Sequence, residues 1–396
     1  MDGLSRFWRS PAEAVFFLVL ALMVIGSLTI YSASSVLGQQ DHGSSLYFVK
    51  RYWLFGGVGL AAVLASLRFG APSWRHLMRP MVLLSFATLL AVMFMGIEVK
   101  GARRWLSLGG FTFQPSEVAK AAVVLMMAVY VTDQWRIRRY VTIFSWPMAV
   151  TGVFCALVYK QPDMGTAAFI ALLAVGVLVV GRLSSRDWGI MLTLAGVLAV
   201  WGTRGAAYRM SRIDGWLDPW GHATTSGYQL VRSLMAIGSG QLTGNGFGQG
   251  ASKFFYLPEA HTDFAFAVLC EEWGFLGALL VIVLFLSLML QYARGCMLAK
   301  KPGEMVLLWG ALLLLCGQAA ANMMMVTGLL PVIGVPLPFI SYGGTSLLVN
   351  LGVVAVSLPI LSRVVKEAQA EKENDGELPP PSSPLRRKRS FLRAVR

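Results

Sequence analysis

Charged side chains are scarce in this sequence. Asp, Glu, Lys and Arg make up 14% of the 396 residues, while 56% are hydrophobic; soluble domains carry about 25% charged residues. The composition therefore excludes a soluble globular protein. Apolar runs of about 20 residues, enough to cross ~30 Å of hydrocarbon, recur along the chain. Backbone groups find no water in lipid, so such runs must form helices or a closed barrel. Runs such as 167–181 lack the period-two alternation of barrel strands, which predicts an all-α polytopic integral membrane protein.

Cysteine and histidine are also rare. The four cysteines have no C-x-x-C spacing, and their apolar surroundings predict buried thiols that act as small hydrophobes. The four histidines are scattered and give no metal-ligand pattern, so no metal site is predicted from them. The first apolar run, Ala14–Tyr31, has no evident cleavage site and is expected to be the first membrane helix rather than a signal peptide. The residues concerned are Cys155, Cys270, Cys296, Cys316, His42, His76, His222 and His261.

Ten stretches are long and apolar enough to be predicted as membrane-spanning helices. They lie in a membrane domain at 14–362, between a short N-terminal segment (1–13) and a basic tail (363–396). The largest connection, 204–262, separates the seventh stretch from the eighth. The ten are Ala14–Ser34, Tyr47–Leu67, Leu77–Ile97, Ser116–Thr132, Val141–Val158, Gly165–Gly181, Trp188–Thr203, Phe264–Leu290, Met305–Gly328 and Ser341–Leu361.

The distribution of Lys and Arg predicts the orientation. Alternate connections carry clusters such as Arg136, Arg138 and Arg139, whereas the connections 35–46 and 329–340 carry no Lys or Arg. Positive residues favour the cytoplasmic side. We therefore expect both termini in the cytoplasm and the loop 204–262 outside. The tail lacks a core-forming pattern and is expected to be disordered, with its RRKR cluster near anionic lipids. The net charge of +14 follows from this topology and is not taken to indicate nucleic-acid binding.

Four cations violate this rule. Lys100, Arg103 and Arg104 lie in the short outer connection 98–115, and Lys160 lies in a second outer turn that continues with Gln161 and Asp163. Translocation of these cations is costly, which suggests that they meet an anion outside. The alternative is that they anchor the chain at the membrane surface together with Trp105.

Two segments predict irregular backbone near the membrane. The first runs from Gly109-Gly110 to Gln114 and Pro115, where a helix is expected to start. Glu117 and Lys120, three residues apart on that helix, share a face and could pair. The second, Leu330–Thr345, holds three prolines and three glycines in 16 residues and cannot form a plain helix. Such backbone persists at membrane depth only inside protein or beside a wet cavity.

The outer loop 204–262 offers one regular element. Gln229–Ile237 is expected to form a short amphipathic helix. The glycine-rich stretch 238–250 superficially resembles a phosphate loop, but no Gly-Lys-Ser/Thr follows, so a nucleotide site is not favoured. A mobile loop that faces sugar or a partner protein is the preferred interpretation.

Asp263, in the stretch YLPEAHTDFAFAVLCEE, is the leading candidate for chemistry. An ionisable residue where a membrane helix begins is costly and is usually functional. If the helix begins near Thr262, that residue could cap it; the helix dipole would then keep Asp263 ionised, whereas burial would raise its pKa. Glu271 and Glu272 lie too far along the helix to complete a two-carboxylate pair. The alternative role for Asp263 is a cap or an ion pair with Arg103 or Arg104.

The unusual residues converge on one side of the predicted membrane domain. This convergence predicts a single outward-facing site for an anionic, amphiphilic ligand such as a lipid-linked phosphate. Its predicted members are Asp263 and the ligand-contacting set Lys100, Arg103, Arg104, Gln114, Glu117, Lys120, Lys160, Gln161, Asp163, His261, Ser341, Gly343 and Gly344.

Five ordered motifs resemble the SEDS family (shape, elongation, division and sporulation proteins). They are KGARRWLSLGGFTFQPSEVAK, QPDMGTA, DPWG…GYQLVRSLMAIGSG, YLPEAHTDFAFAVLCEE and PLPFISYGGTSLL, and they cover nearly the whole chain. The YLPEAHTDF segment and the basic tail look more like the division members or their sporulation relatives than the elongation members, although PVIGVPLPFISYGG also occurs in elongation members. One departure is Gln241, where family members commonly have glycine; little effect is expected.

The resemblance implies a ten-span membrane glycosyltransferase that polymerises lipid II into peptidoglycan glycan strands and releases undecaprenyl pyrophosphate. It implies a class B penicillin-binding protein, a transpeptidase, as partner, other division proteins as contacts, and the bacterial cytoplasmic membrane at the septum as the location. It gives Asp263 the role of catalytic base. Arg103 and Arg104 would stabilise the leaving group, with Lys100, Lys120 or a divalent cation (magnesium or manganese) in support. Two rivals remain open at this point: a lipid II flippase and a non-catalytic scaffold for division proteins.

Overall fold

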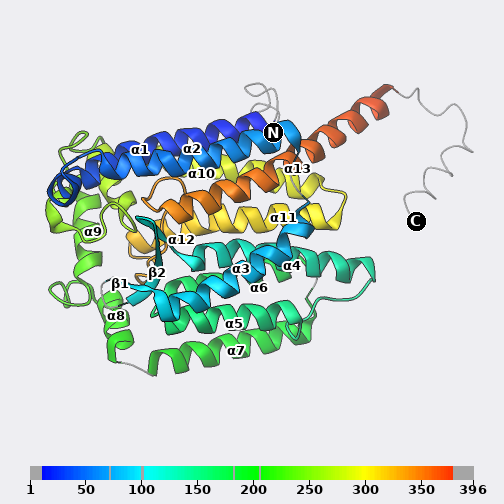
Figure 1. The fold of residues 1–396 in the computed structure, drawn as a ribbon, viewed down its shortest axis with the longest axis horizontal. Helices are drawn as coiled ribbons and strands as arrows, with labels where there is room; N and C mark the ends of the chain where they lie inside the picture. Colours follow the sequence, from blue (N-terminus) through cyan, green and yellow to red (C-terminus); the bar gives the residue numbers. More distant parts are fainter. Residues whose placement is uncertain (1–10, 71–72, 100–101, 182, 205–206, 378–396) are drawn as a thin grey trace, which may run out of the picture.

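The computed structural model describes residues 11–70, 73–99, 102–181, 183–204 and 207–377. These form helices joined by short turns, with one small sheet and one folded loop region (Figure 1). In chain order the elements are α1 (Pro11–His42), α2 (Tyr47–Phe69), α3 (Trp74–Met95), β1 (Ile97–Val99), β2 (Ala102–Leu108), β3 (Phe111–Phe113), α4 (Pro115–Arg136), α5 (Trp146–Lys160), α6 (Met164–Val180), α7 (Ser185–Arg204), α8 (Ala207–Leu217), α9 (Tyr228–Ser239), η2 (Ser252–Tyr256), α10 (Ala265–Leu298), α11 (Pro302–Leu312), η3 (Leu313–Gly317), α12 (Gln318–Val326) and α13 (Gly344–Glu377).

Each of the ten predicted stretches coincides with a helix or, for Met305–Gly328, with the continuous run α11–η3–α12. Among the described residues, seven helices are long and apolar enough to cross a membrane, and α5 and α6 are apolar but shorter. The helical membrane fold is therefore confirmed, while the count of ten crossings stays a prediction.

The helices form one bundle in which α1 and the far part of α13 reach the same end (Figure 1). The sheet, α8 and α9 lie at the opposite end, which we call the distal end. The late helices α10 and α13 return to pack against α1 and α2, and α11 packs between α4 and α10. Both ends of the described chain therefore lie on one side, as an even number of crossings requires.

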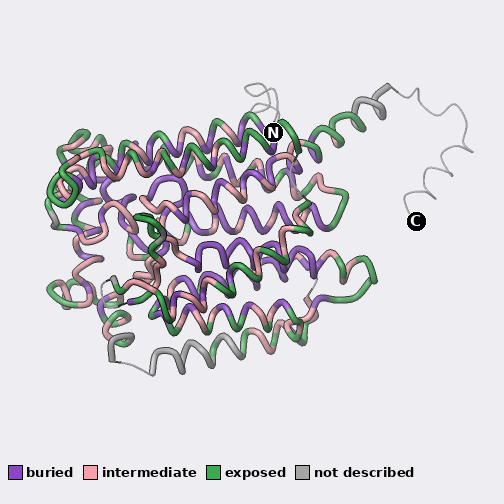
Figure 2. The backbone as a smooth tube through the Cα atoms, in the orientation of Figure 1, coloured by how far each residue is buried: buried purple, intermediate pink, exposed green. Residues whose placement is uncertain are grey.

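Helix α4 is the most enclosed element of the bundle (Figure 2). Every residue from Pro115 to Val131 is buried, because α3, α6, α11 and α13 all pack around it. Its sequence has no polar stripe and is rich in Ala, Val and Met, which suits a helix with protein on every side. Pro115 stands in the first turn, where its missing N–H costs nothing. The start of α4 is thereby fixed at the distal end.

The residues around Gly109 and Gly110 do not form the expected irregular backbone. Residues 97–99, 102–108 and 111–113 form a three-stranded antiparallel sheet in the order β1-β2-β3. Gly109 and Gly110 form the two-residue turn between Leu108 and Phe111, with φ of 56° and 86°. Two successive positive φ values match the tight hairpin turn that glycine pairs favour. The predicted all-α fold class is therefore incomplete, because the protein also contains this small sheet.

The outer loop contains more structure than the single predicted helix. That helix is confirmed as α9, and α8 and η2 accompany it. The glycine-rich stretch packs on α10: the amides of Asn245 and Gly246 donate to the carbonyls of Glu271 and Glu272 at 3.0 and 3.1 Å. A Cβ at Gly240 would lie 1.9 Å from the Cys270 carbonyl oxygen. The glycines therefore serve close backbone packing.

Gln241 takes a left-handed backbone conformation with φ of 47°. A residue with a Cβ costs roughly 1–2 kcal/mol there. The backbone thus explains why glycine suits this position.

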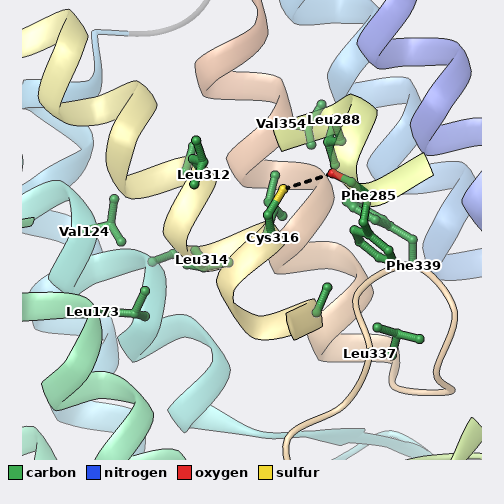
Figure 3. Packing of buried hydrophobic residues seen from close by; sticks show 14 of the residues in the cluster. Val124, Leu173, Phe285, Leu288, Leu312, Leu314, Cys316, Leu337, Phe339 and Val354 are labelled. Carbon is green, nitrogen blue, oxygen red and sulfur yellow. Dashed lines mark hydrogen bonds between the residues drawn. The ribbon is translucent and has the colours of Figure 1, made fainter. Parts of the chain in front are cut away.

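The interior is closely packed and apolar (Figure 3). Cys270 and Cys316 are buried, Cys155 and Cys296 are half-buried, and all four are free thiols. The Cys316 thiol lies 3.8 Å from the Phe285 carbonyl oxygen, among the leucines of α10 and η3. The prediction that these cysteines act as small hydrophobes is confirmed.

A substitution in the first helical turn of α6 would test how closely the distal end is packed. A Cβ at Gly165 would lie 1.7 Å from the Ile333 carbonyl oxygen, whereas a Cβ at Gly152 in α5 meets nothing within 4 Å. We expect Gly165→Ala to lower the free energy of unfolding by about 1–3 kcal/mol through overpacking. Gly152→Ala should be neutral or stabilising, since Ala favours a helix by up to ~1 kcal/mol over Gly. Thermal unfolding of both variants in detergent measures this; equal midpoints would contradict it.

Candidate active site

A polar cavity of about 350 Å³ lies at the distal end. Five separate parts of the chain form it: β2 with the residue that precedes α4, the turn before α6, helices α8 and α9 of the outer loop, the turn around Asp263, and the segment around Gly334. It is lined by Ala102, Arg104, Trp105, Gln114, Pro162, Asp163, Met164, Gly165, Arg212, Gln229, Glu259, Thr262, Asp263, Phe264, Val332, Ile333, Gly334, Pro336, Tyr342, Gly343, Thr345 and Ser346. Some of the residues that the sequence predicts for one outward-facing site therefore do line one cavity.

Asp263 lies in the turn that precedes α10. The helix begins at Ala265, and its N-cap residue, Phe264, has no side-chain cap, so the expectation that Thr262 caps this helix is wrong. The hydroxyl of Thr262 instead donates to Glu259 Oε2 at 2.7 Å. The turn is closed by the Phe264 amide, which donates to the Glu259 carbonyl at 3.1 Å. Asp263 therefore projects from a tight turn rather than from a helix face.

The electrostatics of this turn favour a proton on Asp263. Desolvation by the surrounding protein, followed by the negative charges of Glu259 and Asp163, raises the pKa of the Asp263 carboxyl to about 7; Arg104 opposes the rise. Burial therefore outweighs any dipole effect, which decides the question that the sequence left open. A carboxylate with a pKa near neutrality is suited to accept and release a proton.

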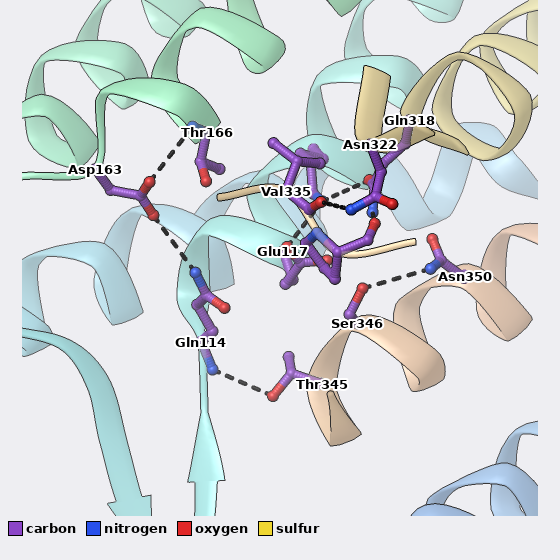
Figure 4. Close-up of polar contacts among 12 residues, drawn as sticks. Gln114, Glu117, Asp163, Thr166, Gln318, Asn322, Val335, Thr345, Ser346 and Asn350 are labelled. Carbon is purple, nitrogen blue, oxygen red and sulfur yellow. Dashed lines mark hydrogen bonds and ion pairs between the residues drawn. The ribbon is translucent and has the colours of Figure 1, made fainter. Parts of the chain in front are cut away.

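Arg104 and Asp163 form the opposite side of the cavity. Arg104 Nη1 lies 3.8 Å from Asp163 Oδ1, and the guanidinium also donates to the carbonyls of Gln161 and Pro162. Asp163 caps α6 by accepting from the Thr166 amide, and Gln114 Nε2 approaches its other oxygen at 3.5 Å (Figure 4). Burial raises the pKa of Asp163, while Arg104 opposes that rise. These contacts hold Arg104 as a positive group in the lining of the same cavity as Asp263, on whose pKa it acts.

Arg103 does not join this cavity. Successive side chains of a strand point to opposite faces, so Arg103 and Arg104 of β2 diverge. Arg103 pairs across the sheet with Glu98 at 3.4 Å. It lines a second, more open cavity of about 370 Å³ with Lys160 and Gln161. Lys100, the remaining predicted cation of this connection, lies outside the described residues.

Glu117 and Lys120 lie behind the cavity rather than in it. They pair at 2.8 Å with side chains that are only 2% and 1% exposed. Lys120 Nζ also donates to Gln318 Oε1 at 2.7 Å. Two buried charges need such partners, because desolvation costs several kcal/mol for each ion. The predicted pairing of Glu117 with Lys120 is confirmed. Neither residue lines the polar cavity, so the structure does not support a direct contact of either with a ligand there.

The remaining predicted residues divide in the same way. Gly343 lines the cavity, whereas Ser341 accepts a hydrogen bond from the Leu337 amide at 2.9 Å and closes a turn. Gly344 starts α13, where a Cβ would meet the Phe55 ring at 2.5 Å. The His261 ring packs beside Phe48 and Tyr342, with centroids 5.1 and 5.9 Å away. Ser341, Gly344 and His261 thus shape the cavity wall.

Several lining residues escaped the sequence analysis. Arg212, on α8, adds a second cation and donates to the Val332 carbonyl at 3.3 Å. Glu259 supplies a carboxylate beside Asp263. Thr345 accepts a hydrogen bond from the Gln114 amide at 3.2 Å. The only sequence feature that singles out Arg212 is its charge in the outer loop. The spacing of the residues around it does not indicate a cavity.

An apolar groove of about 390 Å³ adjoins the polar cavity and shares Thr345 with it. It runs between α3, α4, α11 and α13 toward the opposite end of the bundle. It is lined by Leu77, Met81, Leu84, Phe113, Val118, Ala121, Val124, Leu125, Leu307, Ala311, Thr345, Leu348, Val349, Gly352, Val353, Val356 and Ser357. A polar cavity joined to an apolar groove suits a ligand with an ionic head and a hydrocarbon tail.

No metal centre is built from the described side chains. Within the part of the chain that the structure covers, no three His, Cys, Asp or Glu side chains are arranged to hold an ion. Of the carboxylates that line the cavity, Asp163 lies beside Arg104 and accepts from the Thr166 amide, and Glu259 accepts from the Thr262 hydroxyl. The expected divalent cation therefore has no ready-made set of protein ligands, and no step is assigned to it.

Comparison with protein families decides the relationship. The model of the FtsW/RodA/SpoVE family, described as "Cell cycle protein", matches residues 12–369. The chain belongs to the FtsW/RodA/SpoVE family. This is the SEDS family that the motifs resemble, and the match takes in all the segments that form the polar cavity.

Curated members of the FtsW/RodA/SpoVE family are similar over most of this chain. A "Probable peptidoglycan glycosyltransferase FtsW" of Geobacter sp. (strain M18) is 37% identical over 357 residues, which cover 88% of this chain and 96% of the relative. A protein of the same name from Thioalkalivibrio sp. (strain K90mix) is 35% identical over an alignment that covers 98% of this chain and 96% of that relative.

Solved structures of the FtsW/RodA/SpoVE fold agree. A chain from a peptidoglycan synthase complex, studied for the coordination of polymerization and crosslinking, matches with a TM-score of 0.70 and 26% identity and covers 88% of this chain and 96% of its own. The rod shape determining protein RodA of Thermus thermophilus matches with a TM-score of 0.62 and 25% identity and covers 90% of this chain and 98% of its own.

The buried Glu117–Lys120 pair provides a test of this architecture. We expect Lys120→Met to lower the free energy of unfolding by about 3–5 kcal/mol, because it leaves the Glu117 carboxylate buried and unpaired. The double variant Glu117→Gln/Lys120→Met should recover most of this loss. The exposed pair Lys300–Glu371 is the control, and Lys300→Met should cost less than ~1 kcal/mol. Thermal unfolding in detergent measures all three; a double variant no more stable than Lys120→Met would contradict the prediction.

Proposed function

We propose that this protein is a peptidoglycan glycosyltransferase that polymerises lipid II into glycan strands. The observation that carries the proposal is Asp263, held with a raised pKa in a polar cavity that faces Arg104 and joins an apolar groove. The names of the curated relatives support the same activity.

The proposed reaction uses Asp263 as general base. Its carboxylate takes the proton from the 4-hydroxyl of the acceptor sugar as that oxygen attacks the anomeric carbon of the donor. The bond from that carbon to the pyrophosphate oxygen breaks, and undecaprenyl pyrophosphate leaves with the bonding electrons. Asp263 then returns its proton to solvent. A neighbouring cation stabilises the charge that develops on the leaving group, and Arg104 is the group in position to do so.

The groove gives the substrate a second point of attachment. The leaving group carries a long isoprenyl chain, and the groove lining is almost entirely aliphatic between the shared Thr345 and Leu77. Burial of apolar surface yields about 25 cal/mol per Å². The tail therefore supplies binding energy along the groove, while the head group meets the charges of the polar cavity.

The cellular role follows the relatives that match most fully. Those cited above are named FtsW, so a role in division is favoured over elongation. A class B penicillin-binding protein is the proposed partner, because one structural neighbour comes from a peptidoglycan synthase complex. We place the protein in the bacterial cytoplasmic membrane at the septum, with both termini in the cytoplasm and other division proteins around it.

The rival interpretations receive less support. A flippase requires charged groups along a path through the bilayer, and Glu271 and Glu272 were the candidates. Both are occupied: Glu271 accepts from the amides of Ala251 and Ser252 at 2.8 and 3.3 Å, and Glu272 accepts from the Ser32 hydroxyl. A pure scaffold would not need a polar cavity that encloses three carboxylates and two arginines.

Replacement of the base tests the proposal directly. We expect Asp263→Asn to lower the rate of lipid II polymerisation by about 10²–10⁴-fold, the usual contribution of a general base. Purified wild type and variant, each with its class B partner, would be supplied with lipid II and the glycan products resolved on a gel. The melting temperature of the variant controls for folding. Polymer from the variant at the wild-type rate would refute the base role, and no polymer from wild type would refute the reaction.

The pH dependence of the rate gives a second test. Because the base must be ionised, the rate of polymerisation should rise with pH, reach half of its maximum near pH 7, the pKa of Asp263, and level off above that pH. Glu259→Gln removes a charge that raises this pKa, so the rise should move to lower pH. Arg104→Gln removes a charge that lowers it, so the rise should move to higher pH.

Arg103→Gln is the matched control for this pH test. In the wild-type protein, Arg103 pairs with Glu98 and lines the second cavity. We expect the pH at half-maximal rate to stay unchanged in this variant. Shifts of the Glu259 and Arg104 variants in the same direction would contradict the assignment.

A further inference from the structure

Helix α12 carries two amide side chains in an apolar span. Gln318 and Asn322 are both fully buried and, four residues apart, they share one face of the helix. Buried polar groups in a membrane protein are costly and are usually retained for a function. Neither residue lines the polar cavity, and neither is used in the mechanism above.

Asn322 bonds to the segment that carries the catalytic base. Its Nδ2 donates to the carbonyl of Asp263 at 2.8 Å and to the carbonyl of Val335 at 2.7 Å (Figure 4). A side-chain amide nitrogen has two hydrogens, so both are in use. One side chain thus joins the turn before α10 to the segment Leu330–Thr345.

That segment forms the wall beside the Asp263 carboxylate. A Cβ built on Gly334 would lie 3.4 Å from Asp263 Oδ2, and Gly334 has φ of 64°. From Pro331 to Leu337 the backbone is neither helix nor strand, so its position depends on outside contacts. Gln318 supplies one of these, because its Nε2 donates to the Pro336 carbonyl at 2.8 Å. Helix α12 therefore holds both the base and the wall against which it lies.

The turn η3 directly precedes these two residues. It is a π-helical turn, a feature that adds a residue to a helix and often occurs at functional sites. One added residue rotates the helix that follows by about 100°. The turn thereby sets the direction in which Gln318 and Asn322 face.

Stability alone does not account for Asn322. Within the described part of the chain, its Oδ1 is buried and has no hydrogen-bond partner. An unsatisfied buried acceptor destabilises the fold, whereas an apolar side chain of similar shape avoids this penalty. Ser233 provides a contrast: it is equally buried and donates to the Val326 carbonyl of α12 at 2.7 Å, and within the described residues it has no hydrogen bond to the turn that carries Asp263.

We infer that Asn322 is a positioning residue for glycosyl transfer, which holds the backbone of Asp263 and the wall segment 332–336 at a fixed separation. The inference rests on the proposed function for its catalytic consequence. Its structural content, a clamp between two backbone segments, is independent of the reaction.

The experiment compares Asn322→Leu with Ser233→Ala in the full-length protein bound to its class B partner. Leu has nearly the shape of Asn but donates no hydrogen bond. We expect kcat for lipid II polymerisation to fall about 10²-fold, the cost of misplacing a catalytic group by about 1 Å, while KM changes little. The melting temperature should also fall, because the carbonyls of Asp263 and Val335 lose their donor, so kcat is measured well below the melting temperature of the variant. Ser233→Ala should keep the wild-type kcat. If Asn322→Leu does not fold, Asn322→Ala replaces it.

Amide hydrogen exchange separates the clamp from the reaction. In Asn322→Leu, exchange should rise in residues 259–264 and 332–337, and it should not rise there in Ser233→Ala. Faster exchange with a lost kcat supports the inference. Unchanged exchange, an unchanged kcat, or equal effects in both variants would overturn it. If wild type makes no polymer, the proposed function fails, and the exchange data alone still decide whether Asn322 clamps these segments.

Discussion

The ion pair between Glu117 and Lys120 imposes the strongest constraint on this structure. Both charges lie on the first turns of the most enclosed helix, where an unpaired charge would cost several kcal/mol. Lys120 also donates to Gln318, and Gln318 in turn donates to the Pro336 carbonyl. A chain of polar contacts thus runs from the first turns of α4 to the wall of the cavity. The irregular segment Leu330–Thr345 is tolerated at this depth because the chain satisfies its backbone.

The cavity and the groove divide the work of recognition by polarity. Arg104, Arg212 and three carboxylates gather where β2, α8 and the turn before α10 meet, and aliphatic side chains of α3, α4, α11 and α13 form the adjoining groove. Asp263 lies where desolvation and like charge both raise its pKa, opposite the cation that restrains the rise. This combination suits the proposed role of Asp263 as a base beside a site for negative charge. A soluble sugar nucleotide would leave the groove without a role, whereas a lipid-linked substrate uses both parts.

The small sheet explains the main differences between expectation and structure. Had 97–113 been recognised as strands, the alternation of side chains would have sent Arg103 and Arg104 to opposite faces. From the sequence alone, the two arginines are equivalent cations of one connection. Strands β1 and β3 have only three residues, too few for a periodicity to be identified, and the seven residues of β2, ARRWLSL, do not alternate strictly between polar and apolar. The glycine pair at 109–110 favoured broken backbone instead. The prediction for Thr262 is wrong for a related reason, because the N-cap of α10 is Phe264, two residues further on, and a shift of that size lies within the uncertainty of any helix boundary.

Hydropathy and charge by themselves determined the helical membrane class and the helical segments, because lipid offers the backbone no other partner and the pattern is local. The motifs likewise determined the family, and the position of Asp263 at a helix entrance marked it as exceptional. Only the tertiary structure decided which groups meet Asp263. Glu259 is near in sequence, but Arg104, Asp163, Arg212, Gly334 and Asn322 come from five other segments. These residues come together because of the way α4, α6, α8 and α12 pack around one another. Packing depends on the surfaces of two elements at once, so it cannot be predicted from the sequence of either element alone.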